Sequence, residues 1–167
     1  DGHRYALDGE AVRSVTGILG NAGVVDFTQV PVAILQAAKT RGTNVHKAVH
    51  YYNEHDLDLD AFAADFPDCV GYVRSWIELL NGGRLTTVLC EHRVASRTHR
   101  YAGTIDWLGE FDGHAACIDF ATGDPLDCAK DLQTSGYVIA ATEWAKEPGE
   151  EALRSFLFEL GQVLAIA

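Results

Sequence analysis

Two acidic residues stand inside stretches of this chain that otherwise suit buried strands. Residues 101–123, YAGTIDWLGEFDGHAACIDFATG, carry Asp106 in the first stretch and Asp119 in the second, each among apolar neighbours. Two carboxylates withdrawn from water repel each other, and their burial costs several kcal/mol unless a cation or hydrogen bonds compensate. Oxygen ligands suit Mg²⁺ or Mn²⁺, so the pair predicts a divalent-cation site. Turn capping, or pairing with an arginine such as Arg100, is the alternative interpretation of these acids.

A histidine on another segment adds a nitrogen ligand to this pair. His46 lies in RGTNVHKAVH, which has helical spacing, and His50 one turn later shares its face. A lone histidine on a helix is more often structural than functional. Together with two strand carboxylates, however, His46 forms a more specific metal-binding constellation.

The elements that must position these residues follow in the order helices, strands, helices. Helical spacing predicts helices in VRSVTGILG (capped by Ser14 or Thr16), PVAILQAAK, RGTNVHKAVHYYNEH and CVGYVRSWIELLNGG. A three-stranded meander is predicted over LTTVLCEHRVAS, RYAGTIDWLGEF and HAACIDFAT, with a tight turn at FDGH. Two further helices follow in DLQTSGYVIAATEWA and EEALRSFLFELGQVLAIA. This order predicts an α/β protein in which helices flank one sheet.

Length and composition predict a single domain over residues 1–167. Its N-terminal helical part is expected at about 11–82, its strands at about 84–121 and its C-terminal helices at about 128–167. Neither a long apolar run nor a signal-peptide pattern is present, so no membrane span and a cytoplasmic location are expected. The four cysteines lack metal-site spacing and are expected to be reduced, buried thiols: Cys69, Cys90, Cys117 and Cys128.

The charge balance argues against a general polyanion-binding surface. The chain has 13 lysines and arginines against 24 aspartates and glutamates, which gives a formal net charge of −11. A local basic groove stays compatible with this balance. The best candidates for DNA contacts are Arg41, Lys47, Arg97 and Arg100.

Four short motifs, in this order and at these separations, resemble the RecB-type branch of the PD-(D/E)XK nuclease superfamily, whose phage and prophage members closely share this layout. They are RGTNVH, YAGTIDWLG, IDFATG and LQTSGY, and they span about residues 41–137. The resemblance implies a restriction-endonuclease-like core, with a central mixed sheet that contains a three-stranded antiparallel meander. It also implies a Mg²⁺- or Mn²⁺-dependent DNA nuclease, exonuclease-like, from a bacterial host or phage-infected cell. A recombination or replication protein is a candidate partner. The sequence does not indicate the oligomeric state.

The same resemblance assigns metal ligands residue by residue. His46 matches the helix histidine of the family, and Asp106 and Asp119 match its two strand acids. The backbone carbonyl of Phe120 corresponds to a further ligand.

Other positions of the motifs correspond to supporting roles. Gln133 and Tyr137 match the Gln-x-x-x-Tyr element, which shapes the site and contacts DNA. Glu91, on the preceding strand, is expected to support a second metal or to hydrogen-bond the site. His50 stands where relatives often have an acid, which is expected to alter the surroundings of the metal or its preference.

One position departs from the family pattern. Relatives have a lysine two residues after the second acid, and this chain has Ala121 there, between an intact IDF and an intact TG. A single clean change favours an engineered substitution; natural loss, or transfer of the lysine's role to Lys130 on the next helix, are the alternatives. Loss of one charge-stabilising group predicts a rate loss of roughly 10²–10³. Metal binding is expected to survive, because every proposed ligand is present.

Two other functions compete with an impaired nuclease. A non-catalytic DNA-binding or structural module could keep the same fold. An unrelated hydrolase could use His46, His50 and one carboxylate to hold Zn²⁺, which predicts zinc-stimulated hydrolysis of a substrate other than nucleic acid. The second of these leaves the LQTSGY motif unexplained.

Overall fold

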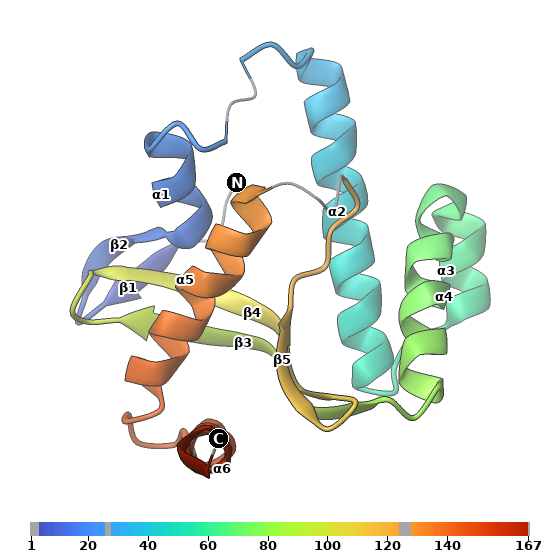
Figure 1. The fold of residues 1–167 in the computed structure, drawn as a ribbon. Helices are drawn as coiled ribbons and strands as arrows, with labels where there is room; N and C mark the ends of the chain where they lie inside the picture. Colours follow the sequence, from blue (N-terminus) through green and yellow to red (C-terminus); the bar gives the residue numbers. More distant parts are fainter. Residues whose placement is uncertain (1–3, 26–27, 124–127, 167) are drawn as a thin grey trace.

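The computed structural model describes residues 4–25, 28–123 and 128–166, which form an α/β fold. A mixed sheet of five strands is flanked by six helices in these residues (Figure 1). The strands are β1 (Tyr5–Leu7), β2 (Glu10–Ser14), β3 (Leu85–Ser96), β4 (Tyr101–Phe111) and β5 (His114–Ile118). The helices are α1 (Val15–Asn21), α2 (Val32–Asn53), α3 (Leu59–Asp65), α4 (Pro67–Asn81), α5 (Cys128–Trp144) and α6 (Glu151–Ile166).

The sheet is built around β4. Strand β3 pairs with it antiparallel from Ser96↔Tyr101 to Leu85↔Phe111. The other edge of β4 is divided between two strands: β2 pairs parallel with its first two residues, and β5 pairs antiparallel from Trp107 onwards. Between these pairings, residues 103–106 have no strand partner on this edge among the described residues. The sheet is therefore forked beside Asp106.

The N-terminal hairpin was not predicted, because residues from about 11 onwards were expected to be helical. Strands β1 and β2 pair from Tyr5↔Val12 to Leu7↔Glu10. Asp8 and Gly9 connect them with φ of 55° and 80°, the left-handed conformations that a two-residue hairpin turn needs. The Asp-Gly pair between YAL and EAVRS is the signal that could have revealed this hairpin.

The helices agree with the sequence in most places. Ser14 caps α1, as predicted, and accepts a hydrogen bond of 3.0 Å from the backbone N–H of Gly17. The two helices predicted in PVAILQAAK and RGTNVHKAVHYYNEH are one continuous helix, α2. Helix α3 was not predicted; Asp58 caps it and accepts from the N–H of Ala61 at 2.9 Å. No described helix combines the length and apolar character that a membrane crossing needs.

The last predicted strand is shorter than expected. HAACIDFAT was predicted to be extended throughout, but β5 ends at Ile118, which pairs with Trp107. Beyond this point the backbone N–H of Phe120 donates to the carboxylate of Asp106 at 2.7 Å. A side chain thus replaces the strand carbonyl as acceptor, and Asp119 follows β5 instead of lying within it.

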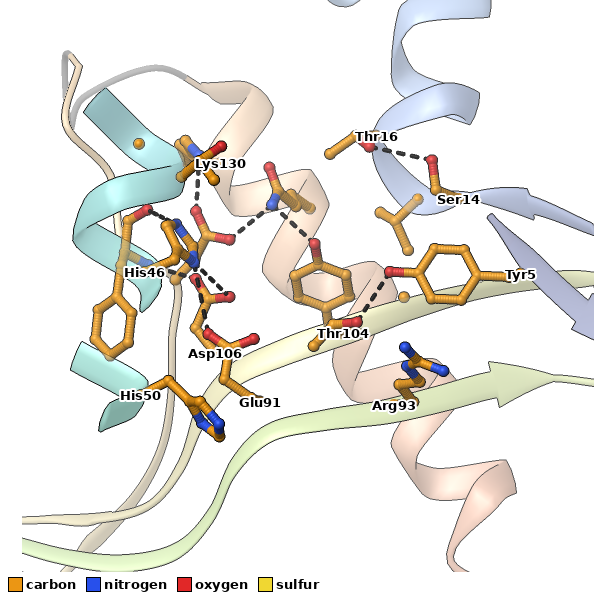
Figure 2. Close-up of a pocket in the computed structure, with 18 of the residues that line it drawn as sticks. Tyr5, Ser14, Thr16, His46, His50, Glu91, Arg93, Thr104, Asp106 and Lys130 are labelled. Atoms are coloured by element: carbon orange, nitrogen blue, oxygen red, sulfur yellow. Dashed lines mark hydrogen bonds and ion pairs between the residues drawn. The ribbon is translucent and has the colours of Figure 1, made fainter. Parts of the chain in front are cut away.

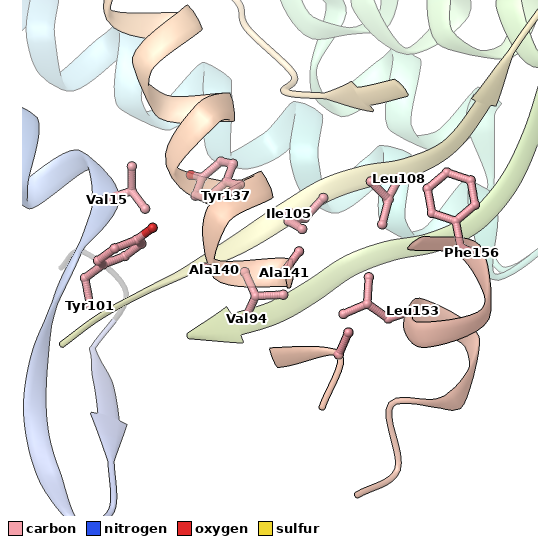
Figure 3. Close-up of a cluster of buried hydrophobic side chains, with 11 residues drawn as sticks. Val15, Val94, Tyr101, Ile105, Leu108, Tyr137, Ala140, Ala141, Leu153 and Phe156 are labelled. Atoms are coloured by element: carbon pink, nitrogen blue, oxygen red, sulfur yellow. The ribbon is translucent and has the colours of Figure 1, made fainter. Parts of the chain in front are cut away.

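Helix α5 covers the sheet and closes the larger hydrophobic core (Figure 3). It approaches β4 so closely that a Cβ at Gly103 would lie 2.4 Å from Cε1 of Tyr137. A second core, centred on Trp76 and Trp107, joins α2 and α4 to the sheet. Cys69, Cys90 and Cys117 are free thiols, as expected, but only Cys69 of these three is buried, while Cys90 and Cys117 are half-buried; the side chain of Cys128 lies outside the described residues.

Gly109→Ala is expected to destabilise the fold. A Cβ at Gly109 would lie 2.1 Å from the backbone oxygen of Thr86, and overpacking of this kind costs roughly 1–3 kcal/mol in the free energy of unfolding. Urea denaturation measures it. Gly71→Ala in α4 is the matched control, since its Cβ meets open space and alanine there should stabilise the helix by roughly 0.5–1 kcal/mol. Equal stability of the two variants would contradict the close packing at Gly109.

Candidate metal centre

The fork beside β4 opens into a cleft of about 620 Å³ (Figure 2). Helices α1, α2 and α5, strands β3 and β4, and the segment after β5 all contribute to its walls. The cleft brings together all the predicted metal ligands and supporting residues: His46, His50, Glu91, Asp106, Asp119, Phe120, Lys130, Gln133 and Tyr137. Segments far apart in the chain thus meet at one place, and Ala121 is the predicted catalytic position that does not line it.

An imidazole and two carboxylates converge at the floor of the cleft. Nδ1 of His46 lies 3.3 Å from Oδ1 of Asp106 and 3.6 Å from Oε1 of Glu91. One potential ligand atom from each of the three residues lies within 4.8 Å of the others. On the other side of the ring, Nε2 of His46 lies 3.0 Å from the carbonyl oxygen of Phe120. His50 lines the cleft but is not among the described groups that converge.

The surroundings of His46 favour a positive charge. Both ring nitrogens face acceptors, whereas a neutral imidazole has one N–H to donate. Burial lowers the pKa of His46, but the hydrogen bonds and charges of Asp106 and Glu91 raise it more strongly, to about 10. Burial raises the pKa of Asp106, while its hydrogen bond to His46 works in the opposite direction. These hydrogen bonds and charges therefore favour a cation at the cluster.

These groups could hold a metal ion. Two carboxylates and an imidazole nitrogen are common metal donors, and a backbone carbonyl lies beside them. Oε1 of Glu91 is buried and faces Nδ1 of His46 at 3.6 Å, so it is positioned to serve as a further ligand. His46, Glu91, Asp106 and the Phe120 carbonyl are the groups that would hold the ion.

Asp119 belongs to a second group, which it forms with residues of α5. Its Oδ2 accepts a hydrogen bond of 2.7 Å from Nζ of Lys130, and its Oδ1 accepts one of 2.6 Å from Nε2 of Gln133. The same amide nitrogen of Gln133 lies 2.9 Å from the hydroxyl of Tyr137. Both oxygens of Asp119 are thus engaged by α5. Glu91, predicted in a supporting role, converges with His46 and Asp106 where Asp119 was expected.

Ala121 lies beside a different cavity. This second cavity, of about 570 Å³, is lined by residues of α2 and α4, among them Tyr72 and Trp76. Asp119 and Phe120 line both cavities, so the segment that carries them forms their common wall.

Glu91 reaches the cluster through an unusual backbone conformation. Its φ is 47°, in the left-handed region that residues other than glycine seldom adopt, and it lies within β3 between the pairs Cys90↔Trp107 and His92↔Ile105. Strained residues of this kind tend to cluster at functional sites. No sequence pattern reveals such a torsion, and the sequence therefore predicted only a supporting role for Glu91.

The basic residues predicted to contact DNA are divided between two places. Lys47 lines the cleft and is exposed. Arg41 is not among the lining residues, and its guanidinium donates to the carbonyl of Thr122 at 3.1 Å. Arg93, which was not predicted, also lines the cleft; its position two residues after Glu91 is the signal that could have identified it.

The other two predicted contacts lie at the turn between β3 and β4. Arg97 forms ion pairs with Asp8 at 2.6 Å and with Glu147 at 2.8 Å. Arg100 pairs with Glu10. These contacts tie the turn to the N-terminal hairpin and to the end of α5, and neither arginine lines the cleft.

Comparisons of this chain with protein-family models, with curated proteins and with solved structures found no match.

Asp106→Asn is expected to weaken divalent-cation binding by about tenfold or more, since it removes a negative charge that faces His46. Isothermal titration with MnCl₂ measures the dissociation constant directly. Asp112→Asn is the matched control, because Asp112 lies on an exposed turn and pairs with Arg84 outside the cleft. Equal Mn²⁺ affinity of the two variants would exclude Asp106 as a ligand.

Proposed function

We propose that this protein is a metal-dependent DNA nuclease with a fold of the PD-(D/E)XK type, close to the RecB-type branch. The observation that carries the proposal is the convergence of His46, Glu91 and Asp106 in a cleft that also exposes basic side chains. The resemblance of four sequence motifs points to the same class.

The donor set supports hydrolysis of a phosphodiester. In this reaction a water oxygen bonds to phosphorus and the bond from phosphorus to the leaving ester oxygen breaks, while one proton passes overall from the water to the leaving oxygen. A divalent ion bound by these residues would supply a Lewis acid that lowers the pKa of water and offsets negative charge on the phosphate. Asp106 and Glu91 would hold the ion, and the hydrogen bond from Phe120 N–H to Asp106 fixes one carboxylate.

Basic groups around the acids suit a polyanionic substrate. Lys47, Arg93 and Lys130 line the cleft, although the chain as a whole carries a net charge of −11. Backbone phosphates bind side chains of this kind without regard to sequence. The negative charge elsewhere on the protein confines favourable DNA contacts to this local surface.

A non-catalytic DNA-binding module is the second candidate. The observation in its favour is Ala121, where the resembled family has its lysine. Such a module would bind DNA through the same cleft and leave it intact. A nuclease that is slowed because Ala121 replaces the lysine is the intermediate case, and the same experiment tests it.

DNA cleavage is the decisive measurement. The unmodified chain is expected to shorten end-labelled linear DNA in Mg²⁺ or Mn²⁺, and EDTA should stop the reaction. Asp106→Asn should lower the rate by at least about 10², while Asp112→Asn should leave it unchanged. Faster loss of linear than of circular DNA would indicate an exonuclease.

If the chain binds DNA but neither it nor Ala121→Lys cleaves it with any of these ions, the protein is a non-catalytic DNA-binding module. Zinc-specific hydrolysis of another substrate would exclude both.

Lys47→Gln and Arg93→Gln are expected to weaken DNA binding about equally for all sequences. Each should reduce the slope of log affinity against log salt concentration by about 1, because each removes one phosphate contact. Fluorescence anisotropy of labelled DNA in Ca²⁺, over a range of salt concentrations, gives this slope. Lys39→Gln is the matched control, as Lys39 is exposed on the same helix and does not line the cleft. An unchanged slope in both test variants would remove these side chains from the interface.

A further inference from the structure

Lys130 occupies a position from which it can act in the reaction. It lies in the first turn of α5, and its Nζ lies 2.7 Å from Oδ2 of Asp119. The side chain of Asp119 is 7% exposed and that of Lys130 is 34% exposed, so the ammonium reaches from the cleft to a nearly buried carboxylate. Among the described lysines and arginines that line the cleft, Lys130 is the one that forms an ion pair with an acid of the site.

Position 121 does not line the cleft in which the reaction is proposed to occur. Residues two positions apart in an extended strand point to the same face of a sheet. Strand β5 ends at Ile118, however, so this period does not carry over from Asp119 to Ala121. Ala121 lines the cavity between α2 and α4 instead of the cleft that contains His46 and Asp106.

Helix α5 presents Lys130 together with the rest of the motif. Lys130, Gln133 and Tyr137 recur at a spacing of three and four residues, which puts them on one face of the helix. Lys130 and Gln133 each bind one oxygen of Asp119, and Gln133 also contacts Tyr137. The helix that carries the Gln-x-x-x-Tyr element therefore also delivers a cation to the acid.

We propose that Lys130 is a catalytic residue of this nuclease and that Ala121 is not a lesion; the inference rests on the proposed function. The ammonium donates hydrogen bonds to the attacking water and to a phosphate oxygen, and offsets the charge that develops as the water oxygen bonds to phosphorus. Lys130 keeps its three protons throughout. The water's proton goes to solvent, and the leaving oxygen takes one from solvent.

A purely structural role for Lys130 makes a different prediction. If it served only to neutralise buried Asp119, its removal would lower the stability of the fold, and activity would fall through unfolding or loss of the metal. A catalytic role predicts that the cleavage rate falls while the fold and the metal affinity are kept. Lys130→Met should bind Mn²⁺ as tightly as the unmodified chain or more tightly, because a competing positive charge has gone, and yet cleave DNA about 10²–10³ times more slowly.

The experiment compares the unmodified chain with Lys130→Met, Lys130→Arg, Lys146→Met and Ala121→Lys. It measures the cleavage rate of linear DNA, Mn²⁺ affinity by titration calorimetry, and the unfolding temperature. Lys146 is the matched control, because it is exposed and follows the opposite end of α5. We expect Lys130→Met alone to lose its rate with metal affinity and unfolding temperature kept, and Lys130→Arg to retain more activity than Lys130→Met.

The remaining outcomes separate the two proposals. Full activity of Lys130→Met, or loss of its metal binding or fold together with its activity, would overturn the role of Lys130 and leave the nuclease function standing. An inactive chain that Ala121→Lys activates would do the same and identify Ala121 as the lesion. Inactivity of both the unmodified chain and Ala121→Lys would overturn the nuclease function itself.

Discussion

The burial of two carboxylates is the constraint on which this structure depends. The side chains of Asp106 and Asp119 are each 7% exposed, and an ionised acid withdrawn from water must gain a partner of opposite charge or hydrogen bonds. Asp106 receives His46 and the N–H of Phe120, and Asp119 receives Lys130 and Gln133. Because these partners come from α2 and α5, both helices must lie beside the same part of β4.

The forked sheet makes this arrangement possible. A continuous strand along the edge of β4 away from β3 would occupy the space beside residues 103–106, where the segment after β5 donates the N–H of Phe120 to Asp106. Dividing that edge between β2 and β5 leaves the gap, while β3 holds the opposite edge along its length. Close packing of Tyr137 on Gly103 then brings α5 near enough for its polar face to reach Asp119. The cleft is thus a consequence of strand pairing.

Local sequence patterns were sufficient for most of the helices and for strands β3 and β4, but not for the N-terminal hairpin, for α3 or for the pairing of the strands. Helical spacing and the Ser14 cap identified α1, and the run of apolar residues around Asp106 identified β4, because periodicity and capping act over a few residues. The hairpin turn at Asp8 was overlooked, and the end of β5 depends on a contact with Asp106 that no local pattern contains. The motif order located His46 and Asp106 in the cleft, but not the difference between position 121 and Lys130, since that difference arises only from tertiary packing.

The left-handed backbone of Glu91 has a consequence for how this protein can change over time. A residue held in that region costs of order 1–3 kcal/mol, and glycine at the same position would escape the cost. Selection for thermal robustness alone would therefore favour glycine there, and would at the same time delete a carboxylate from the cluster. Glu91 thus combines a strained backbone with a carboxylate of the cluster at a single residue.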